Sequence, residues 1–173
     1  MQDILQRAAR IRLLILDVDG VLTDGRLYLS SDGVESKAFH TRDGHGIKLL
    51  REGGVNVAVI SGRRSRAVEL RMAELGVEHL YQGIDNKLTA LTELVSALDI
   101  ELDEVAHVGD DVIDLPVMRR VGLGIAVQDA SEFVKRHAHW QTASAGGRGA
   151  VRDACELILE AQGSLAALLD RYL

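Results

Sequence analysis

The stretch IRLLILDVDGVLTDG, residues 11–25, decides how the rest of the chain is interpreted. A short apolar run leads directly into Asp17 and Asp19. Such a run, when it ends at a turn, is typical of a strand that is buried on both faces of a parallel sheet. The carboxyl ends of these strands form the ligand crevice of an open α/β sheet. The stretch therefore predicts two carboxylates at the mouth of a site, with Gly20 behind them to turn the backbone.

The Asp-Val-Asp-Gly segment also has two simpler interpretations, a plain acidic turn and a calcium-binding loop. An acidic turn would have the same composition. A calcium loop would carry a glutamate at its twelfth position, and that position is Tyr28. The calcium loop is therefore excluded, and the plain turn loses support if polar residues also follow other strands.

Composition limits the class of protein. A chain of 173 residues that is 47% hydrophobic is expected to form one domain, residues 1–173, with a sizeable core. A formal net charge of −6 argues against nucleic acid or an anionic membrane surface as a partner. The single cysteine, Cys155, forms no internal disulfide, and no signal-peptide or membrane-spanning pattern is present. These features predict a soluble cytoplasmic protein.

Short apolar runs alternate with helical patterns along the chain. Strands are expected at residues 11–17, 55–60, 77–81, 105–108 and 123–127. Between and around them, helices are expected at 1–10, after the polar loop 40–46, after Ser65, at 86–98, through 114–118 and at 150–161. This alternation predicts an α/β fold with a doubly wound parallel sheet. Residues 26–40 predict a small β-hairpin insertion, and residues 146–173 form a C-terminal tail.

Polar residues do follow other predicted strands or open the next helix. Ser61 ends one apolar run, Lys87 opens a helix, and Asp110 ends another run. Lysine in the first turn opposes the helix dipole, which suggests a role beyond helix stability. A sheet of this kind gathers such residues into one crevice, together with Asp17 and Asp19.

Together, these acids, the serine and the lysine are the residue types that a phosphate monoester hydrolase needs. Asp17 and Asp110 offer the hard oxygen ligands that Mg²⁺ prefers, while Ser61 and Lys87 can hold phosphate oxygens. Asp17 can act as the nucleophile and form an aspartyl-phosphate. Asp19 can protonate the leaving oxygen and later deprotonate water. Each residue alone has an ordinary structural explanation, as a turn, a solvated lysine or a capped helix, but their joint occurrence in this order favours catalysis.

The same residues resemble the motifs of the haloacid dehalogenase superfamily of phosphatases. Asp17-x-Asp19-Gly20 is similar to its first motif, Ser61 to its second, Lys87 to its third and Gly109-Asp110-Asp111-x-x-Asp114 to its fourth. The resemblance implies a Rossmann-like core.

Longer segments narrow the resemblance to the 3-deoxy-D-manno-octulosonate 8-phosphate phosphatases and cover nearly the whole chain. The segments are 17–25, 26–40, 42–44, 46–48, 61–63, 109–116 and 146–149. Membership of this family would imply that the protein has no cap domain. It would also imply a homotetramer, in which the hairpins of the subunits meet at the centre and the C-terminal tail of one subunit can reach the site of a neighbour. The implied product is the free sugar acid used in bacterial lipopolysaccharide.

The resemblance also implies residue roles. Mg²⁺ would be held by the carboxylates of Asp17 and Asp110 and by the backbone carbonyl of Asp19. Arginines suit the carboxylate of a phosphorylated sugar acid. The implied substrate contacts are Asp19, His40, Thr41, Arg42, Asp43, Gly44, Lys48, Arg63, Arg71 and Lys87.

Three alternatives remain open at this point. Relatives that act on a nine-carbon sugar acid 9-phosphate tend to carry glutamate where Arg63 stands, so Arg63 favours the eight-carbon substrate. A non-catalytic assembly module, as carried by some sugar nucleotide transferases, would not need the complete set of acids, serine and lysine. A signalling receiver domain would place its phosphorylated aspartate after a later strand, and Ser61 ends the run 55–60 instead.

Overall fold

The computed structural model describes residues 1–173 and is built on one sheet of six parallel strands, in the order β5-β4-β1-β6-β7-β8. The strands are β1 (Leu13–Leu16), β4 (Asn56–Ser61), β5 (His79–Gln82), β6 (Val105–Gly109), β7 (Leu123–Ala126) and β8 (Trp140–Gln141). Successive connections run outward from β1 in both directions, so a topological switch point lies between β1 and β6. This order confirms the predicted doubly wound α/β sheet.

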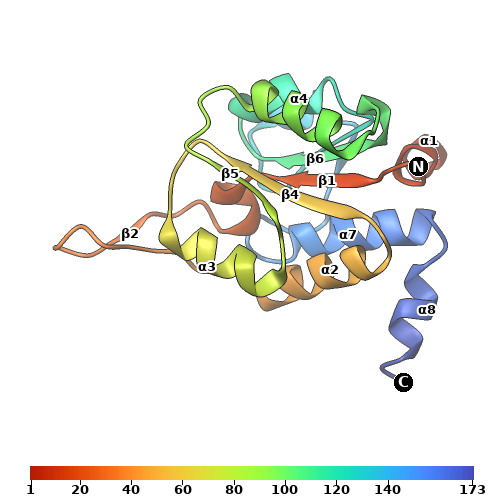
Figure 1. Cartoon of the computed structure of the whole chain (residues 1–173), viewed down its shortest axis with the longest axis horizontal. Coiled ribbons are helices and arrows are strands. Elements are labelled where there is room, and N and C mark those ends of the chain that lie inside the picture. Colours follow the sequence, from red (N-terminus) through yellow and green to blue (C-terminus); the bar gives the residue numbers. More distant parts are fainter.

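Helices cover both faces of the sheet (Figure 1). They are α1 (Gln2–Ala8), α2 (Thr41–Glu52), α3 (Arg66–Leu75), α4 (Lys87–Leu98), α5 (Leu115–Met118), α6 (Glu132–Lys135), α7 (Ala150–Ala161) and α8 (Leu165–Asp170). Two short turns of helix lie at Leu102–Glu104 and Val112–Asp114, and a tight turn with non-helical backbone angles at Asp19 and Gly20 spans Val18–Leu22.

Alternating side chains of β1 point to two separate parts of the core. Leu14 packs in the large cluster that includes α2, α3 and α7, whereas Ile15 packs in the smaller cluster under α4 and α5. Every residue of β1 is fully buried, as expected for the central strand of a parallel sheet covered on both faces. The strand predicted at residues 11–17 is thus confirmed, although the observed strand is shorter and covers only Leu13–Leu16.

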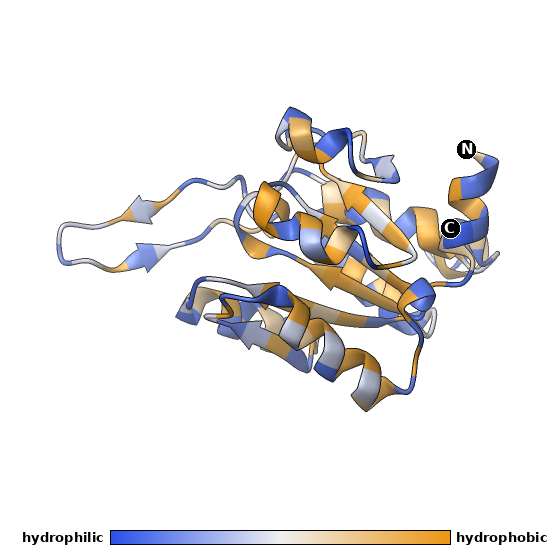
Figure 2. Ribbon diagram, turned by 90° about the horizontal axis from the view of Figure 1, so that it is seen from above, coloured by the Kyte–Doolittle hydropathy of each residue, from blue (hydrophilic) through white to orange (hydrophobic).

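The hairpin insertion is present and projects away from the sheet (Figures 1 and 2). Its strands β2 (Tyr28–Leu29) and β3 (Glu35–Ser36) pair antiparallel and form the only other sheet. Several apolar hairpin side chains are exposed, among them Leu27, Leu29 and Val34. Most of the hairpin therefore packs against nothing in its own chain.

The prediction of a polar loop at residues 40–46 is wrong, because α2 already begins at Thr41. Gly46 allows α2 to pack closely against α7, because a Cβ there would lie 3.1 Å from the Cα of Arg152. Helix propensity disfavours glycine by about 1 kcal/mol, and tertiary packing overrides that preference here. The short elements β8 and α6 were also missed, because two to four residues carry too little periodicity to be recognised.

No helix of the structure is both long enough and apolar enough to cross a membrane.

Truncation of the central strand should destabilise the fold strongly. We expect Leu14→Ala to lower the free energy of unfolding by about 3 kcal/mol, because it removes a fully buried side chain and leaves a cavity. Leu70→Ala on α3 is the matched control: Leu70 is 57% exposed, and its loss should change stability by less than about 0.5 kcal/mol. Urea unfolding of both variants measures the difference, and equal destabilisation would contradict the assignment of the core.

Candidate active site

The site forms where β1 and β6 end side by side. Asp17 directly follows β1, is buried, and donates its backbone N–H to the carbonyl of Val108 at 3.1 Å. The chain then turns at Gly20, whose φ is +93°. A Cβ on Gly20 would lie 2.2 Å from Asp110 Oδ2, so a side chain there would displace that carboxylate. Glycine is thus required for two acidic loops to approach one another.

Lys87 is the buried cation of the site. It is the first residue of α4, and its Nζ donates to Asp17 Oδ1 at 2.5 Å and to Asp114 Oδ1 at 2.7 Å. Burial works to lower the pKa of Lys87, but attraction to the two carboxylates outweighs it and raises the pKa above its ordinary value. The unfavourable position of a lysine at a helix start, noted from the sequence, is thus offset by two ion pairs.

Asp114 belongs to the site although no role was predicted for it. It is fully buried, and its Oδ2 accepts the backbone N–H of Asp110 at 3.1 Å while Oδ1 binds Lys87. Asp114 therefore positions both the lysine and the loop that carries Asp110. The signal was present in the spacing of the Gly109–Asp114 motif, where the last aspartate returns to the site through one short turn of helix.

His107 lies beneath this group, on the face of β6 covered by α4 and α5. It is fully buried, its two ring nitrogens have no hydrogen-bond partner, and Nε2 is 3.7 Å from Asp114 Oδ1. Burial lowers the pKa of His107 to about 4. The ring is therefore neutral at pH 7 and adds no second positive charge to the site.

The carboxylates of Asp17, Asp110 and Asp114 form a cluster that suits a divalent cation. One oxygen from each lies within 4.8 Å of the others. Burial, together with repulsion from Asp114, raises the pKa of Asp17 to about 6 despite the opposing effect of Lys87. Burial and repulsion from Asp17 and Asp114 likewise raise the pKa of Asp110 to about 7. Three acids share one lysine, and a hard cation would relieve the excess negative charge.

Ser61 reaches the same edge of the sheet from the neighbouring strand. Leu16 pairs with Val59, so Ser61 lies at the level of the loop that follows Asp17. Its side chain is buried, and its Oγ accepts the backbone N–H of Arg63 at 3.2 Å. The hydroxyl thus lies at the start of a turn whose next residues face the site.

Asp19 points toward the hairpin and is surrounded by positive charge. Lys37 donates to Asp19 Oδ1, and Arg63 Nε lies 3.5 Å from Asp19 Oδ2. Arg63 also binds Glu35 of β3 at 2.5 Å. Lys37 was missed from the sequence because nothing in its local pattern distinguishes it from a solvated hairpin lysine.

The C-terminal glycine segment, residues 146–149, covers the loop that follows β1 in its own chain. The N–H of Gly147 donates to the carbonyl of Val21 at 2.9 Å. A Cβ on Gly146 would lie 1.7 Å from the carbonyl oxygen of Gly20, a distance that no side chain tolerates. The first part of the predicted tail is therefore a fixed wall of the site.

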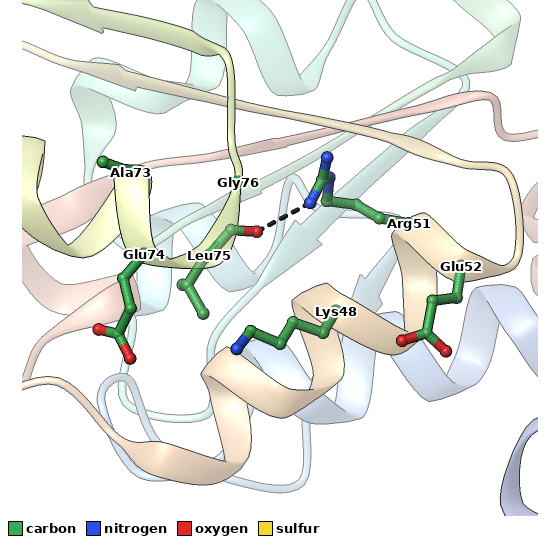
Figure 3. A pocket seen from close by; sticks show the side chains of 7 residues that line it. All are labelled: Lys48, Arg51, Glu52, Ala73, Glu74, Leu75 and Gly76. Carbon is green, nitrogen blue, oxygen red and sulfur yellow. Dashed lines mark hydrogen bonds between the residues drawn. The ribbon is translucent and has the colours of Figure 1, made fainter.

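Several predicted substrate contacts lie together, but apart from the acidic cluster. Thr41, Gly44, Lys48 and Arg71 line a cavity of about 220 Å³ between α2 and α3 that contains none of the five predicted catalytic and metal residues. A second cavity of about 400 Å³ adjoins Lys48, where Arg51 donates to the carbonyl of Leu75 at 2.9 Å (Figure 3). Arg42 lines a third cavity, of about 590 Å³, with residues of α7.

Asp43, one of the predicted substrate contacts, already has partners within the protein. Its side chain is buried, and its carboxylate accepts the backbone N–H groups of Arg152 at 2.9 Å and Gly149 at 3.3 Å. These bonds hold the start of α7 against α2, and a contact of Asp43 with substrate stays a prediction. His40, at the N-terminal end of α2, is half-buried, and its Nδ1 lacks a partner.

Neutralising Asp114 should reduce both activity and stability. In Asp114→Asn the buried lysine would keep only one carboxylate partner, and we expect phosphate release to fall by about 10- to 100-fold with a loss of stability of about 3 kcal/mol. Asp111→Asn is the matched control, because Asp111 is exposed and asparagine preserves its cap on the N–H of Val112. Equal effects of the two substitutions in activity assays and urea unfolding would contradict this role of Asp114.

Comparisons with known proteins agree with this geometry. A family model described as haloacid dehalogenase-like hydrolase matches residues 80–154. The chain is 52% identical over 163 residues to the 3-deoxy-D-manno-octulosonate 8-phosphate phosphatase KdsC of Yersinia pestis, covering 94% of this chain and 87% of that protein. The KdsC of Escherichia coli K12 matches with the same identity and coverage.

A solved structure of the 3-deoxy-D-manno-octulosonate 8-phosphate phosphatase of Moraxella catarrhalis, in complex with magnesium, phosphate and KDO, superposes with a TM-score of 0.98. It is 43% identical, and the match covers 100% of this chain and 99% of that chain. The corresponding structure from Yersinia pestis gives a TM-score of 0.94 at 51% identity, covering 95% of this chain and 89% of that chain. With this identity along nearly its whole length, the chain belongs to the 3-deoxy-D-manno-octulosonate 8-phosphate phosphatase family of haloacid dehalogenase-like hydrolases.

Proposed function

We propose that this protein is a Mg²⁺-dependent phosphatase that hydrolyses 3-deoxy-D-manno-octulosonate 8-phosphate to the free sugar acid and phosphate. The observation that carries the proposal is the cluster of Asp17, Asp110 and Asp114 at the switch point of the sheet, in which the buried Lys87 binds Asp17 and Asp114. The Moraxella relative, whose structure holds magnesium, phosphate and KDO, supports the choice of substrate and metal.

The donor set fits magnesium. The carboxylates of Asp17 and Asp110 and the backbone carbonyl of Asp19 would hold the ion, in agreement with the preference of Mg²⁺ for a few oxygen ligands and substrate phosphate. When bound, Mg²⁺ offsets the repulsion between an anionic nucleophile and the phosphate dianion. Lys87 adds a fixed positive charge to the same end of the site.

The chemical steps follow from the two aspartates of the first loop. A carboxylate oxygen of Asp17 attacks phosphorus, and the bond from phosphorus to the sugar oxygen breaks. Asp19 gives its proton to that oxygen, which leaves as the free sugar acid and leaves an aspartyl-phosphate on Asp17. Asp19 then takes a proton from water as the water oxygen attacks phosphorus, which releases phosphate and restores Asp17. Ser61 and Lys87 hold the phosphate oxygens throughout.

Substrate selection is proposed to come from residues outside the acidic cluster. Arg63 is half-exposed beside Asp19 and suits the carboxylate of the sugar acid. The other proposed contacts are His40, Thr41, Arg42, Gly44, Lys48 and Arg71.

We infer that copies of the chain assemble as a homotetramer through the hairpin. Leu27, Leu29 and Val34 are 51%, 63% and 59% exposed, and apolar side chains gathered on one projecting element are typical of an interaction surface. We also propose that the enzyme works in the bacterial cytoplasm, where it supplies the sugar acid for lipopolysaccharide. Its one cysteine, Cys155, is buried and forms no disulfide, which suits a reducing compartment.

Loss of the nucleophile should abolish the reaction. We expect Asp17→Asn to lower Mg²⁺-dependent phosphate release from 3-deoxy-D-manno-octulosonate 8-phosphate by about 10⁴-fold or more, with a native circular dichroism spectrum. Asp170→Asn on the exposed α8 is the control and should keep full activity. A screen that includes a nine-carbon sugar acid 9-phosphate tests the substrate: faster turnover of that compound, or near wild-type activity of folded Asp17→Asn, would refute the proposal.

Magnesium should stabilise the protein more at high pH than at low pH. The pKa values of Asp17 and Asp110 in the metal-free fold, about 6 and about 7, lie above the ordinary carboxyl value. The folded state therefore binds more protons than the unfolded chain between about pH 4 and 7, and metal-free stability falls as pH rises through that window. Protons compete with Mg²⁺ for the same oxygens in this range.

Thermal unfolding with and without Mg²⁺ measures this effect. At saturating Mg²⁺ we expect Tm to rise at pH 8 by about 5–10 °C, which corresponds to about 2.7 kcal/mol at a hundred times Kd. At pH 5.5 the rise should be much smaller. Asp110→Asn should lose most of the response at both pH values. An equal rise at pH 8 and pH 5.5 would contradict a site built on these carboxylates.

A further inference from the structure

Lys37 is a buried charge on an otherwise exposed hairpin. It follows β3 directly, and its side chain is only 2% exposed. Its Nζ donates to Asp19 Oδ1 and lies 3.5 Å from Glu35 Oε1. The base of the hairpin thus inserts a lysine beside the aspartate that we propose as general acid and base.

Lys37 and Asp19 belong to a closed group of four charges. Arg63 Nη2 lies 2.5 Å from Glu35 Oε1, and Arg63 Nε lies 3.5 Å from Asp19 Oδ2. With Asp19 ionised, as it is when it accepts a proton from water, two cations and two carboxylates balance to zero net charge. Burial works to raise the pKa of Glu35, but hydrogen bonds from Arg63 and Ser65 and the charge of Lys37 outweigh it and lower the pKa. Glu35 therefore stays ionised and connects the two cations.

The two cations differ in their freedom to move. The side chain of Arg63 is 49% exposed, whereas that of Lys37 is 2% exposed. Arg63 can turn toward an incoming anion while water solvates it on the way. Lys37 has no such path, because moving it away from Asp19 and Glu35 would leave a buried charge without a partner.

We propose that Lys37 is a positioning residue that orients Asp19 for proton transfer when Arg63 is recruited to the substrate. This inference rests on the proposed phosphatase function. The ammonium fixes one oxygen of the Asp19 carboxylate, so the other oxygen is presented to the leaving sugar oxygen and then to water. The hairpin thereby completes the site of its own chain, independently of any assembly.

The test compares two leaving groups. The sugar oxygen of 3-deoxy-D-manno-octulosonate 8-phosphate needs a proton to depart, whereas p-nitrophenolate departs without one. We expect Lys37→Met to lower kcat on the sugar phosphate by about 10² with less than about a threefold change in KM. On p-nitrophenyl phosphate, the first step, measured as the burst of p-nitrophenolate in a single turnover, should change in rate by less than about threefold, because only the later hydrolysis of the aspartyl-phosphate needs Asp19. Lys37→Arg keeps a displaced positive charge and should show the same selectivity with a smaller loss.

Controls separate this role from folding and assembly. Arg26→Met removes a 70% exposed cation from the same hairpin and should leave both activities unchanged. Light scattering and thermal unfolding of each variant measure mass and stability. If Lys37→Met does not fold, the test uses Lys37→Arg instead, and a greater loss on the sugar phosphate than in the burst on p-nitrophenyl phosphate supports the positioning role.

In a folded variant, an equal loss in kcat on the sugar phosphate and in the burst rate on p-nitrophenyl phosphate, or no loss in either, would overturn the positioning role while leaving the phosphatase proposal intact. Failure of the wild-type enzyme to release phosphate from both compounds would instead refute the proposed function itself.

Discussion

The structure depends on one buried ion-pair arrangement, in which Lys87 is shared by Asp17 and Asp114. Burying two carboxylates at the end of a sheet would be strongly unfavourable without a cation between them. The lysine comes from the start of α4, on one face of the sheet, and the acids follow β1 and β6. Their attraction therefore joins three segments that are distant in sequence. With Asp110 included, the site has two carboxylates more than a single lysine and a neutral His107 can balance, which favours a divalent cation.

Close backbone approaches around this cluster depend on glycine. Gly20 gives space to the Asp110 carboxylate, and Gly146 lies against the carbonyl of Gly20. The catalytic loop is thus clamped between the loop after β6 and the segment before α7. A loop held on both sides keeps its two aspartates in fixed relative positions, which proton transfer and nucleophilic attack both require.

The hairpin contributes at two levels. Its outer part exposes apolar side chains, while its base buries Lys37 against Asp19 and binds Arg63 through Glu35. A short insertion can therefore reach both Asp19 and Arg63 without forming a separate cap domain. These ion pairs connect the two residues within one chain.

From the sequence alone, five of the six parallel strands and the residues that gather at their carboxyl ends could be predicted. Buried parallel strands are marked by apolar runs, and ligand-binding residues follow such strands in this class of fold, so Asp17, Ser61 and Asp110 could be placed together from local pattern. Tertiary structure alone decided the helical start of α2, the buried role of Asp43 and the contacts of Lys37 and Asp114. These features depend on side chains from distant segments, through close glycine packing and ion pairing, and neither leaves a periodic signal in the local sequence.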